Sequence, residues 1–282
     1  MSLTWEKIDA VPGWFGFQSY AVWRALLEHQ RGRSLRGDLF EIGVWKGKSA
    51  SVLASYRKPE EKLYLCDLAL DEPAVHAAMR SVGVEPAGIV PLSGPSEELA
   101  GKLDLKAMFQ TVRWFHIDGE HTGISVWREL EIANAVLNAN GIVVIDDFFS
   151  PRYPANTTEA VRYLEKNPFH FRLLAVAFNK GYLCRPEAVA GYMDYLASDM
   201  TLAMHRHGLR ATIFKSTGPW DTDAVGIVDY VEDVGPLAGP DRTPHLWHAI
   251  QTRPAWSPFW HLRNLAARFG LNRLGLRRRG GA

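Results

Sequence analysis

Between residues 36 and 186, short apolar runs alternate with stretches of helical periodicity, and this alternation constrains the fold more than any other feature of the chain. Each apolar run is bounded by turn-forming or polar residues, which is typical of a strand buried inside a sheet. Such runs occur at residues 38–44, 62–67, 88–92, 112–118 and 141–146. Helices are predicted at residues 20–30, 48–55, 73–82, 96–103, 124–137 and 157–166. Strands that alternate with helices predict a parallel sheet with helices on both faces.

The last part of this series departs from strict alternation. Residues 171–178 and 182–184 are predicted strands, and Asn179-Lys180-Gly181 between them is a turn signal. The two strands predict an antiparallel hairpin, which an ordinary dinucleotide-binding fold would not need. We therefore expect an α/β fold with a doubly wound, mostly parallel, seven-stranded Rossmann-like sheet, closed by the hairpin and followed by a C-terminal extension.

These patterns divide the chain into an N-terminal helical or lid segment (1–35), a core (36–186) and a C-terminal extension (187–282). The extension predicts a long helix at 187–207 and strands at 210–215 and 224–231, followed by a stretch rich in proline and tryptophan at 235–258. Its basic tail ends in Arg277-Arg278-Arg279. That tail suits either a frayed terminus or an amphipathic helix that contacts a membrane surface or an acidic glycan.

Overall charge and composition exclude several classes of protein. A formal net charge of +1 gives no global attraction to nucleic acid. No apolar run approaches the roughly 20 residues of a membrane span, and the N-terminal residues are too polar for a signal peptide. Cys66 and Cys184 lie in apolar runs and are expected to be buried free thiols. We expect a cytoplasmic homo-oligomer without a transmembrane segment.

The first predicted strand ends in a glycine loop, Glu41-Ile-Gly43-Val-Trp-Lys-Gly47-Lys-Ser49. Trp45 stands where the middle glycine of a dinucleotide fingerprint would be, which disfavours a cofactor whose pyrophosphate needs close backbone approach. The loop suits a cofactor with a cationic amino group, although an ordinary strand-to-helix turn has the same pattern. Asp67 ends the second strand, where a carboxylate can accept both hydroxyls of a ribose. Together the two features predict an adenosine-binding site.

Three acids, Asp118, Asp146 and Asp147, follow the fourth and fifth predicted strands. Neighbouring strand ends bring carboxylates together, and a hard divalent cation such as Mg²⁺ would relieve their repulsion. Alternatively, Asp146 caps its strand and Asp147 faces solvent. His121 follows Asp118 by three residues and is a candidate general base, or else a structural histidine. His116 lies inside the fourth strand and is expected to be structural.

With these residues, the stretch from about Phe40 to Cys184 resembles the class I S-adenosylmethionine-dependent methyltransferases. The resemblance implies that residues 36–186 bind S-adenosylmethionine and that Asp67 binds its ribose. It also implies adenine contacts within residues 91–99. The cofactor-binding residues expected on this basis are Glu41, Gly43, Gly47, Ser49, Asp67, Ser93, Ser96 and Asp118.

Asp118-x-x-His121 followed by Asp146-Asp147 is most similar to the metal-dependent sugar O-methyltransferases that act on macrolide and aminocoumarin glycosides. The resemblance implies that Asp118, Asp146 and Asp147 hold magnesium or another divalent cation and that His121 is the base. Catechol-type enzymes have lysine and asparagine where this chain has His121 and Asp147. The expected function is therefore methylation of a hydroxyl on a sugar or a glycosylated natural product.

Three other functions stay open on the sequence: a catechol-like or other small-molecule O-methyltransferase, an NAD-dependent oxidoreductase, and a non-catalytic glycan-binding module. The missing middle glycine counts against the oxidoreductase, and the complete set of acids counts against the module. The aromatic segment from Trp14 to Tyr20 is either a lid that stacks on sugar rings or a stretch that packs against the sheet edge.

Overall fold

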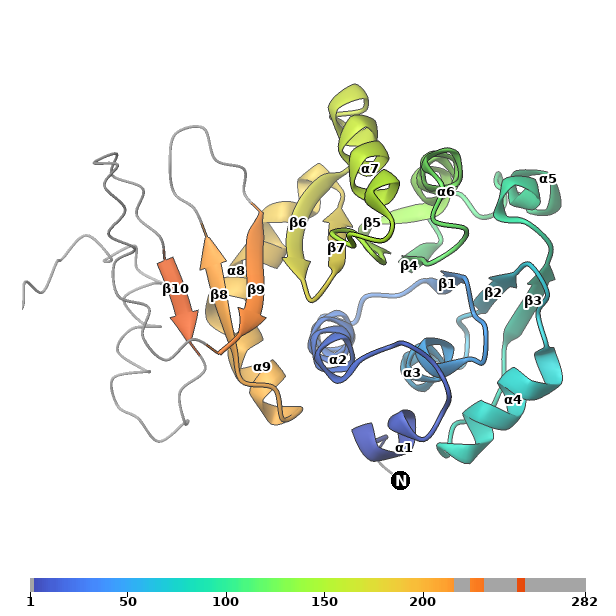
Figure 1. Cartoon of the computed structure of the whole chain (residues 1–282), viewed down its shortest axis with the longest axis horizontal. Coiled ribbons are helices and arrows are strands. Elements are labelled where there is room, and N and C mark those ends of the chain that lie inside the picture. The colour runs from blue at the N-terminus through green and yellow to red at the C-terminus, as the bar shows by residue number, and fades with distance from the viewer. Residues whose placement is uncertain (1–2, 216–223, 231–247, 252–282) are drawn as a thin grey trace, which may run out of the picture.

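A computed structural model describes residues 3–215, 224–230 and 248–251 (Figure 1). Its strands form one sheet in the order β10-β8-β9-β6-β7-β5-β4-β1-β2-β3. The parallel part consists of β1 (Asp38–Ile42), β2 (Leu63–Asp67), β3 (Ile89–Ser93), β4 (Val112–Ile117) and β5 (Leu137–Ile145). Next to β5, the strand β7 (Lys180–Cys184) runs antiparallel to both β5 and β6 (Arg172–Ala177). The predicted α/β fold, with its seven-stranded unit and closing hairpin, is confirmed.

Three further strands lengthen the sheet beyond the predicted seven. They are β8 (Ala211–Lys215), β9 (Val225–Asp229) and β10 (His248–Gln251). Strand β9 pairs in parallel with β6, and β8 pairs antiparallel with both β9 and β10. The division of the chain at residues 35 and 186 stays a prediction. Most of the stretch 235–258 and all of the basic tail lie outside the described residues.

Helices cover both faces of the sheet, and each face has its own apolar core (Figure 1). One core contains buried side chains of α2 (Phe17–Gly32), α3 (Lys48–Tyr56), α4 (Glu72–Ser81), α8 (Val189–Ser198) and α9 (Met200–Arg206), with Ile8 of α1 (Trp5–Asp9). The other contains side chains of α6 (Gly123–Val136) and α7 (Pro154–Lys166), with Leu99 of α5 (Leu99–Lys102). Short 3₁₀ helices lie at η1 (Ser96–Glu98) and η2 (Pro186–Ala188).

Two local predictions were wrong. The hairpin turn consists of Phe178 and Asn179, with φ of 47° and 70°, because a two-residue hairpin that follows the strand twist needs positive φ at both positions. Lys180 therefore belongs to β7 instead of the turn. The helix predicted at 187–207 is interrupted, since α8 ends at Ser198 and α9 begins at Met200.

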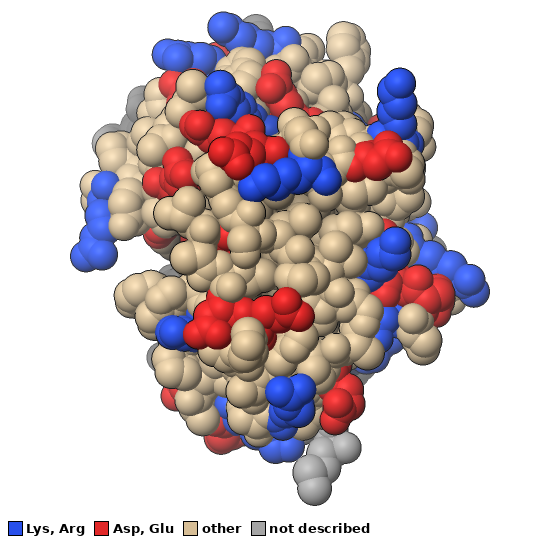
Figure 2. Space-filling model, turned by 90° about the vertical axis from the view of Figure 1, so that its right-hand side faces the viewer, with Lys and Arg blue, Asp and Glu red and all other residues tan. Residues whose placement is uncertain are grey.

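The charges on the surface and the lengths of the helices agree with the net charge and the short apolar runs of the sequence. On the face shown in Figure 2, acidic and basic side chains are interspersed instead of gathered by sign, in line with the net charge of +1. Within the described part of the chain, every helix is too short or too polar to cross a membrane.

Backbone hydrogen bonds continue past the strand ends and bring the loops of the site together. Gly43 N donates to Cys66 O, Asp118 N to Ile42 O and Asp146 N to Ile117 O, at 2.8–2.9 Å. Gly43 has φ of +84°, and a Cβ there would overlap the carbonyl group of Asp118. The loop after β1 therefore packs directly on the backbone after β4, and only glycine fits at this crossing.

Replacing Gly43 with alanine should destabilise the protein by about 1–3 kcal/mol, because the new methyl group is strained at positive φ and also displaces Asp118. Thermal unfolding measures the effect. Gly226→Ala is the matched control, since no atom lies within 4 Å of its added Cβ. Equal stability of the two variants would contradict this account of the crossing.

Candidate active site

A cavity of about 350 Å³ lies at the carboxyl ends of the parallel strands, where ligands bind in open α/β sheets. It is bounded by the loops that follow β1, β2, β3 and β4, together with one residue from the N-terminal segment. The residues that line it are Trp14, Ile42, Gly43, Trp45, Cys66, Asp67, Leu68, Gly94, Pro95, Ser96, Asp118, Gly119, Glu120 and His121. The fold therefore brings five residues predicted for the site, Gly43, Asp67, Ser96, Asp118 and His121, to one cavity.

Asp67 organises the glycine loop from the neighbouring strand. Its Oδ2 accepts hydrogen bonds from the amides of Val44 at 2.9 Å and Trp45 at 2.7 Å, and its Oδ1 accepts one from Ala69 at 3.1 Å. Gly47, at φ +81°, precedes α3, and a Cβ there would lie 3.0 Å from a methyl group of Val75. The packing of the loop itself therefore explains why glycine recurs at positions 43 and 47. Asp67 both holds this loop and lines the cavity.

Four of the predicted cofactor residues are absent from the described lining of the cavity. Glu41 is fully buried in β1, and Ser49 is buried in α3. Ser93 ends β3, where its carbonyl group accepts a hydrogen bond from Lys102 Nζ at 2.9 Å. Gly47 lies at the start of α3. Their roles toward a cofactor stay predictions.

Glu129 on α6 is a buried acid behind the cavity wall that the sequence reasoning missed. Its side chain lies against Gly119, which lines the cavity, and only 1% of the residue is exposed. Burial raises the pKa of Glu129 to about 7, while the nearby Ser96 hydroxyl opposes the rise and Glu120 adds to it. Glu129 falls on the face of α6 whose other residues are mostly apolar and buried. An acid on that face is the only feature of the sequence that could have pointed to it.

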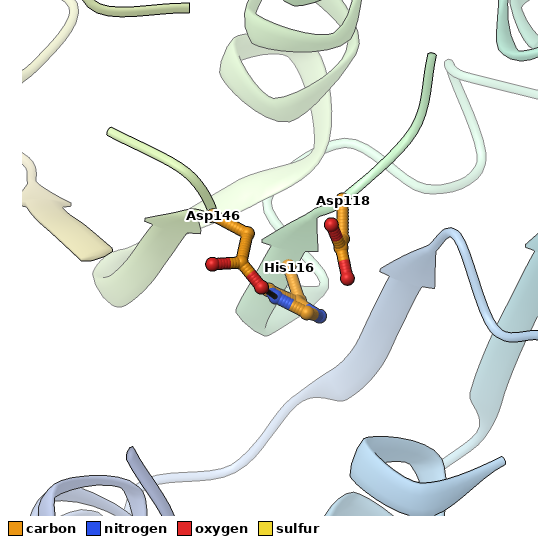
Figure 3. Close-up of side chains that lie close together, drawn as sticks. All are labelled: His116, Asp118 and Asp146. Carbon is orange, nitrogen blue, oxygen red and sulfur yellow. Dashed lines mark ion pairs between the residues drawn. The ribbon is translucent and has the colours of Figure 1, made fainter. Parts of the chain in front are cut away.

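Acidic groups and one imidazole gather beside the cavity (Figure 3). Ligand atoms of His116, Asp118 and Asp146 lie within 4.8 Å of one another. Burial, and then the Asp146 carboxylate, raise the pKa of Asp118 well above its ordinary value. Burial alone would raise the pKa of Asp146 too, but the Lys180 ammonium and the His116 ring hold it below its ordinary value. At Asp118, the acid that lines the cavity, the Lys180 charge only partly offsets burial and the repulsion from Asp146.

Lys180 supplies a cation that the sequence reasoning did not place in the site. Its buried Nζ forms an ion pair with Asp146 Oδ2 and lies 5.7 Å from the centre of the Phe15 ring. The next residue back, Asn179, donates a hydrogen bond from Nδ2 to Asp147 Oδ1 at 2.6 Å. The β6–β7 hairpin thus holds both acids that follow β5.

His121 faces two of the predicted metal ligands. Its Nε2 is 3.8 Å from Asp118 Oδ1 and 3.7 Å from Asp147 Oδ2. The ring packs against Tyr153 with centroids 4.3 Å apart, and Nδ1 lies 3.3 Å from Asn156 Nδ2. Both His121 and Asp147 have positive φ, 56° and 52°, which turns their loops sharply at the strand ends.

Two tryptophans stack at the mouth of the cavity. The Trp14 and Trp45 rings are 4.7 Å apart with an interplanar angle of 23°, and Trp14 is 88% exposed. Both residues line the cavity. The aromatic segment is therefore divided: Trp14 borders the cavity, whereas Phe15 and Tyr20 are buried in the core.

Comparison with known proteins finds one matching domain family and several similar folds. Residues 40–148 match a family described as a methyltransferase domain. The O-methyltransferase NovP has a similar fold, with a TM-score of 0.50, 18% identity, and coverage of 59% of this chain and 80% of NovP. A protein from Corynebacterium glutamicum gives a TM-score of 0.51 at 12% identity, covering 66% of this chain and 92% of that one. No curated protein sequence matches the chain. The family match favours a methyltransferase over the oxidoreductase and the non-catalytic module.

Glu129 predicts a distinct pH dependence of stability. The folded protein holds a proton on Glu129 up to a pKa of about 7, whereas the unfolded chain releases it near 4.5. Stability should therefore fall as pH rises through this window, by up to about 3 kcal/mol, and Glu129→Gln should remove that component. Chemical unfolding of both proteins between pH 4.5 and 8 measures the difference. The exposed residue Glu165 on α7 provides the control, Glu165→Gln. Parallel curves for wild type and Glu129→Gln would refute the assignment.

Proposed function

We propose that this S-adenosylmethionine-dependent methyltransferase is an O-methyltransferase that uses a divalent cation and acts on a hydroxyl of a sugar or a glycosylated natural product. The observation that carries the proposal is the acid cluster next to the cofactor cavity, with His121 between Asp118 and Asp147. Transfer to a hydroxyl requires a proton acceptor and charge stabilisation at the acceptor oxygen, and this arrangement offers both.

The cavity suits S-adenosylmethionine in shape and charge. Asp67 would accept the ribose hydroxyls, and Ser96 lies on the part of the wall predicted to contact adenine. Gly43 also lines the cavity, and its missing side chain would let the methionine part approach the backbone. The cofactor supplies a methyl group on a positively charged sulfur, and the acidic surroundings favour that charge.

Asp118, Asp146 and Asp147 fit a hard cation such as Mg²⁺, which prefers carboxylate oxygen ligands. The raised pKa of Asp118 supports this fit, because the Lys180 charge does not fully offset burial and the Asp146 carboxylate. A bound divalent cation supplies Lewis acidity to a hydroxyl oxygen. Lys180 already neutralises one charge on Asp146, so it limits the excess negative charge of the cluster.

His121 is the proposed general base. Its Nε2 faces the cavity side of the cluster, and the carboxylates of Asp118 and Asp147 would stabilise the imidazolium that forms when the ring takes a proton. To accept through Nε2, the ring must hold its proton on Nδ1. In the structure Asn156 Nδ2 lies 3.3 Å from Nδ1 and also donates to Asp146 O, so this tautomer requires the Asn156 amide to move away from the ring nitrogen.

Positioning accounts for much of the proposed rate gain. Reactants held in line can reach effective molarities of about 10⁵ M or more. The cofactor loop and the acid cluster are joined at the crossing of Gly43 and Asp118, so donor and acceptor would be held by one rigid edge of the sheet. The stacked, exposed rings of Trp14 and Trp45 offer an apolar surface for the face of a sugar ring.

Calorimetric titration tests the cofactor and the cation together. We expect S-adenosylmethionine to bind at micromolar strength and Mg²⁺ to produce a separate binding signal. Asp146→Asn should abolish the Mg²⁺ signal and keep the cofactor affinity, while Asp194→Asn, an exposed acid on α8, should change neither. Cofactor binding without any Mg²⁺ signal in the wild type would remove the metal from the proposal, and no cofactor binding would remove the proposal itself.

His121→Ala should lower kcat by about 10²–10⁴ on any glycoside that the wild type methylates, with unchanged cofactor affinity, because only proton removal is lost. The exposed residue His205 on α9 provides the control, His205→Ala. Steady-state kinetics with calorimetry separates the two effects. A kcat close to that of the wild type would show that another group accepts the proton.

A further inference from the structure

We propose that His116 is a nitrogen ligand of the divalent cation, together with Asp118 and Asp146, and that Glu41 orients its ring. The inference rests on the proposed metal dependence but changes the donor set from oxygen alone to nitrogen and oxygen. It also gives roles to two residues that the sequence analysis interpreted otherwise, since His116 was expected to be structural and Glu41 to contact the cofactor.

Strand geometry directs His116 toward the acids. His116 and Asp118 are two positions apart, at the end of β4, so their side chains leave the same face of the strand. Glu41 is the direct partner of His116 in the parallel register of β1 and β4. Asp146 follows the neighbouring strand β5. Figure 3 shows the imidazole lying between the two aspartate side chains.

The hydrogen bonding of the ring determines which nitrogen is free. Nδ1 lies 2.8 Å from Glu41 Oε1, and a carboxylate so close accepts a proton from that nitrogen. In the tautomer that donates from Nδ1, the lone pair of the ring is on Nε2 and is available to a metal ion. That atom is fully buried and has no hydrogen-bond partner in the part of the chain that the structure describes. A buried acceptor left without a partner is costly unless a cation or a donor occupies its open side.

The distances from His116 Nε2 to the nearby carboxylate oxygens are short enough for one metal ion to lie between them. Asp146 Oδ2 lies 4.0 Å from Nε2, which is too long for a hydrogen bond. A single ion about 2.1 Å from each atom spans that separation. Asp118 offers an oxygen in the same cluster, within 4.8 Å of the other ligand atoms. Small rotations of the two aspartate side chains would bring all three donors to one ion.

Glu41 provides support of the kind that metal-binding histidines commonly have. A carboxylate on the second ring nitrogen fixes the tautomer and raises the basicity of the ligating nitrogen. Glu41 is fully buried in β1. The Trp23 ring packs edge-on against the imidazole of His116, with ring centroids 4.6 Å apart. The ring is thus held firmly with Nε2 toward the acids.

The mixed donor set changes the expected metal. Mg²⁺ prefers an all-oxygen environment, whereas imidazole ligands favour transition metals such as Mn²⁺, Co²⁺ or Zn²⁺. The ammonium of Lys180 already pairs with Asp146 Oδ2, so the metal ion would share that oxygen with it. We expect Mn²⁺ to bind at least tenfold more tightly than Mg²⁺.

Pulsed electron paramagnetic resonance of the full-length protein with Mn²⁺ tests the assignment directly, because it detects a nitrogen nucleus bonded to the ion. Wild type and His121→Gln should show the nitrogen coupling, and His116→Gln should lose it and bind Mn²⁺ at least tenfold more weakly. His121→Gln is the matched control, because that histidine borders the same acids but is assigned no bond to the ion.

Glu41→Gln keeps the imidazole and should retain the coupling while weakening Mn²⁺ binding about 10-fold or more. This variant and the wild-type spectrum decide the question if His116→Gln does not fold. Bound Mn²⁺ without nitrogen coupling in the wild type, or coupling that persists in folded His116→Gln, would overturn the inference and leave the all-oxygen metal site standing. Failure of Mn²⁺ to bind would overturn both metal assignments, while S-adenosylmethionine binding would still identify the methyltransferase.

Discussion

Repulsion among the carboxylates at the ends of β4 and β5 is the constraint on which the rest of the site depends. Three like charges in a poorly solvated pocket cannot all be ionised without compensation. The fold compensates them unequally. Asp146 has a direct ion pair with the Lys180 ammonium and a lowered pKa, whereas at Asp118 the same charge does not offset burial and repulsion, and the pKa is raised. The acid with the raised pKa is the one that lines the cavity, where our proposal places the sulfonium of the cofactor and a divalent cation.

The antiparallel hairpin is the element that makes this arrangement stable. Its turn residues, Phe178 and Asn179, adopt positive φ, which sets the register so that Lys180 is buried at the start of β7. From there the hairpin holds Asp146 through Lys180 and Asp147 through the amide of Asn179. A strand pair that ends the seven-stranded unit is therefore also the electrostatic partner of the acids that follow β5.

Much of this could be predicted from the sequence, because strand ends in a parallel sheet share one edge and chemically reactive residues there stand out from apolar runs. The fold and the meeting of Gly43, Asp67, Asp118 and His121 follow from that rule. The pairing of Glu41 with His116 does not, since it depends on the register of β1 against β4 across 75 positions. Lys180 was missed for a related reason: a turn misplaced by one residue moves a side chain from the loop to the core.

The crossing of Gly43 over Asp118 explains why the cofactor loop and the acid cluster belong together physically. The Cα of Gly43 packs against the carbonyl group of Asp118, and the amide of Asp118 bonds to Ile42 of the same strand end. A displacement of one loop must therefore move the other. In-line transfer is sensitive to small errors in the positions of the reacting atoms. A rigid backbone contact therefore supports it better than long side chains do.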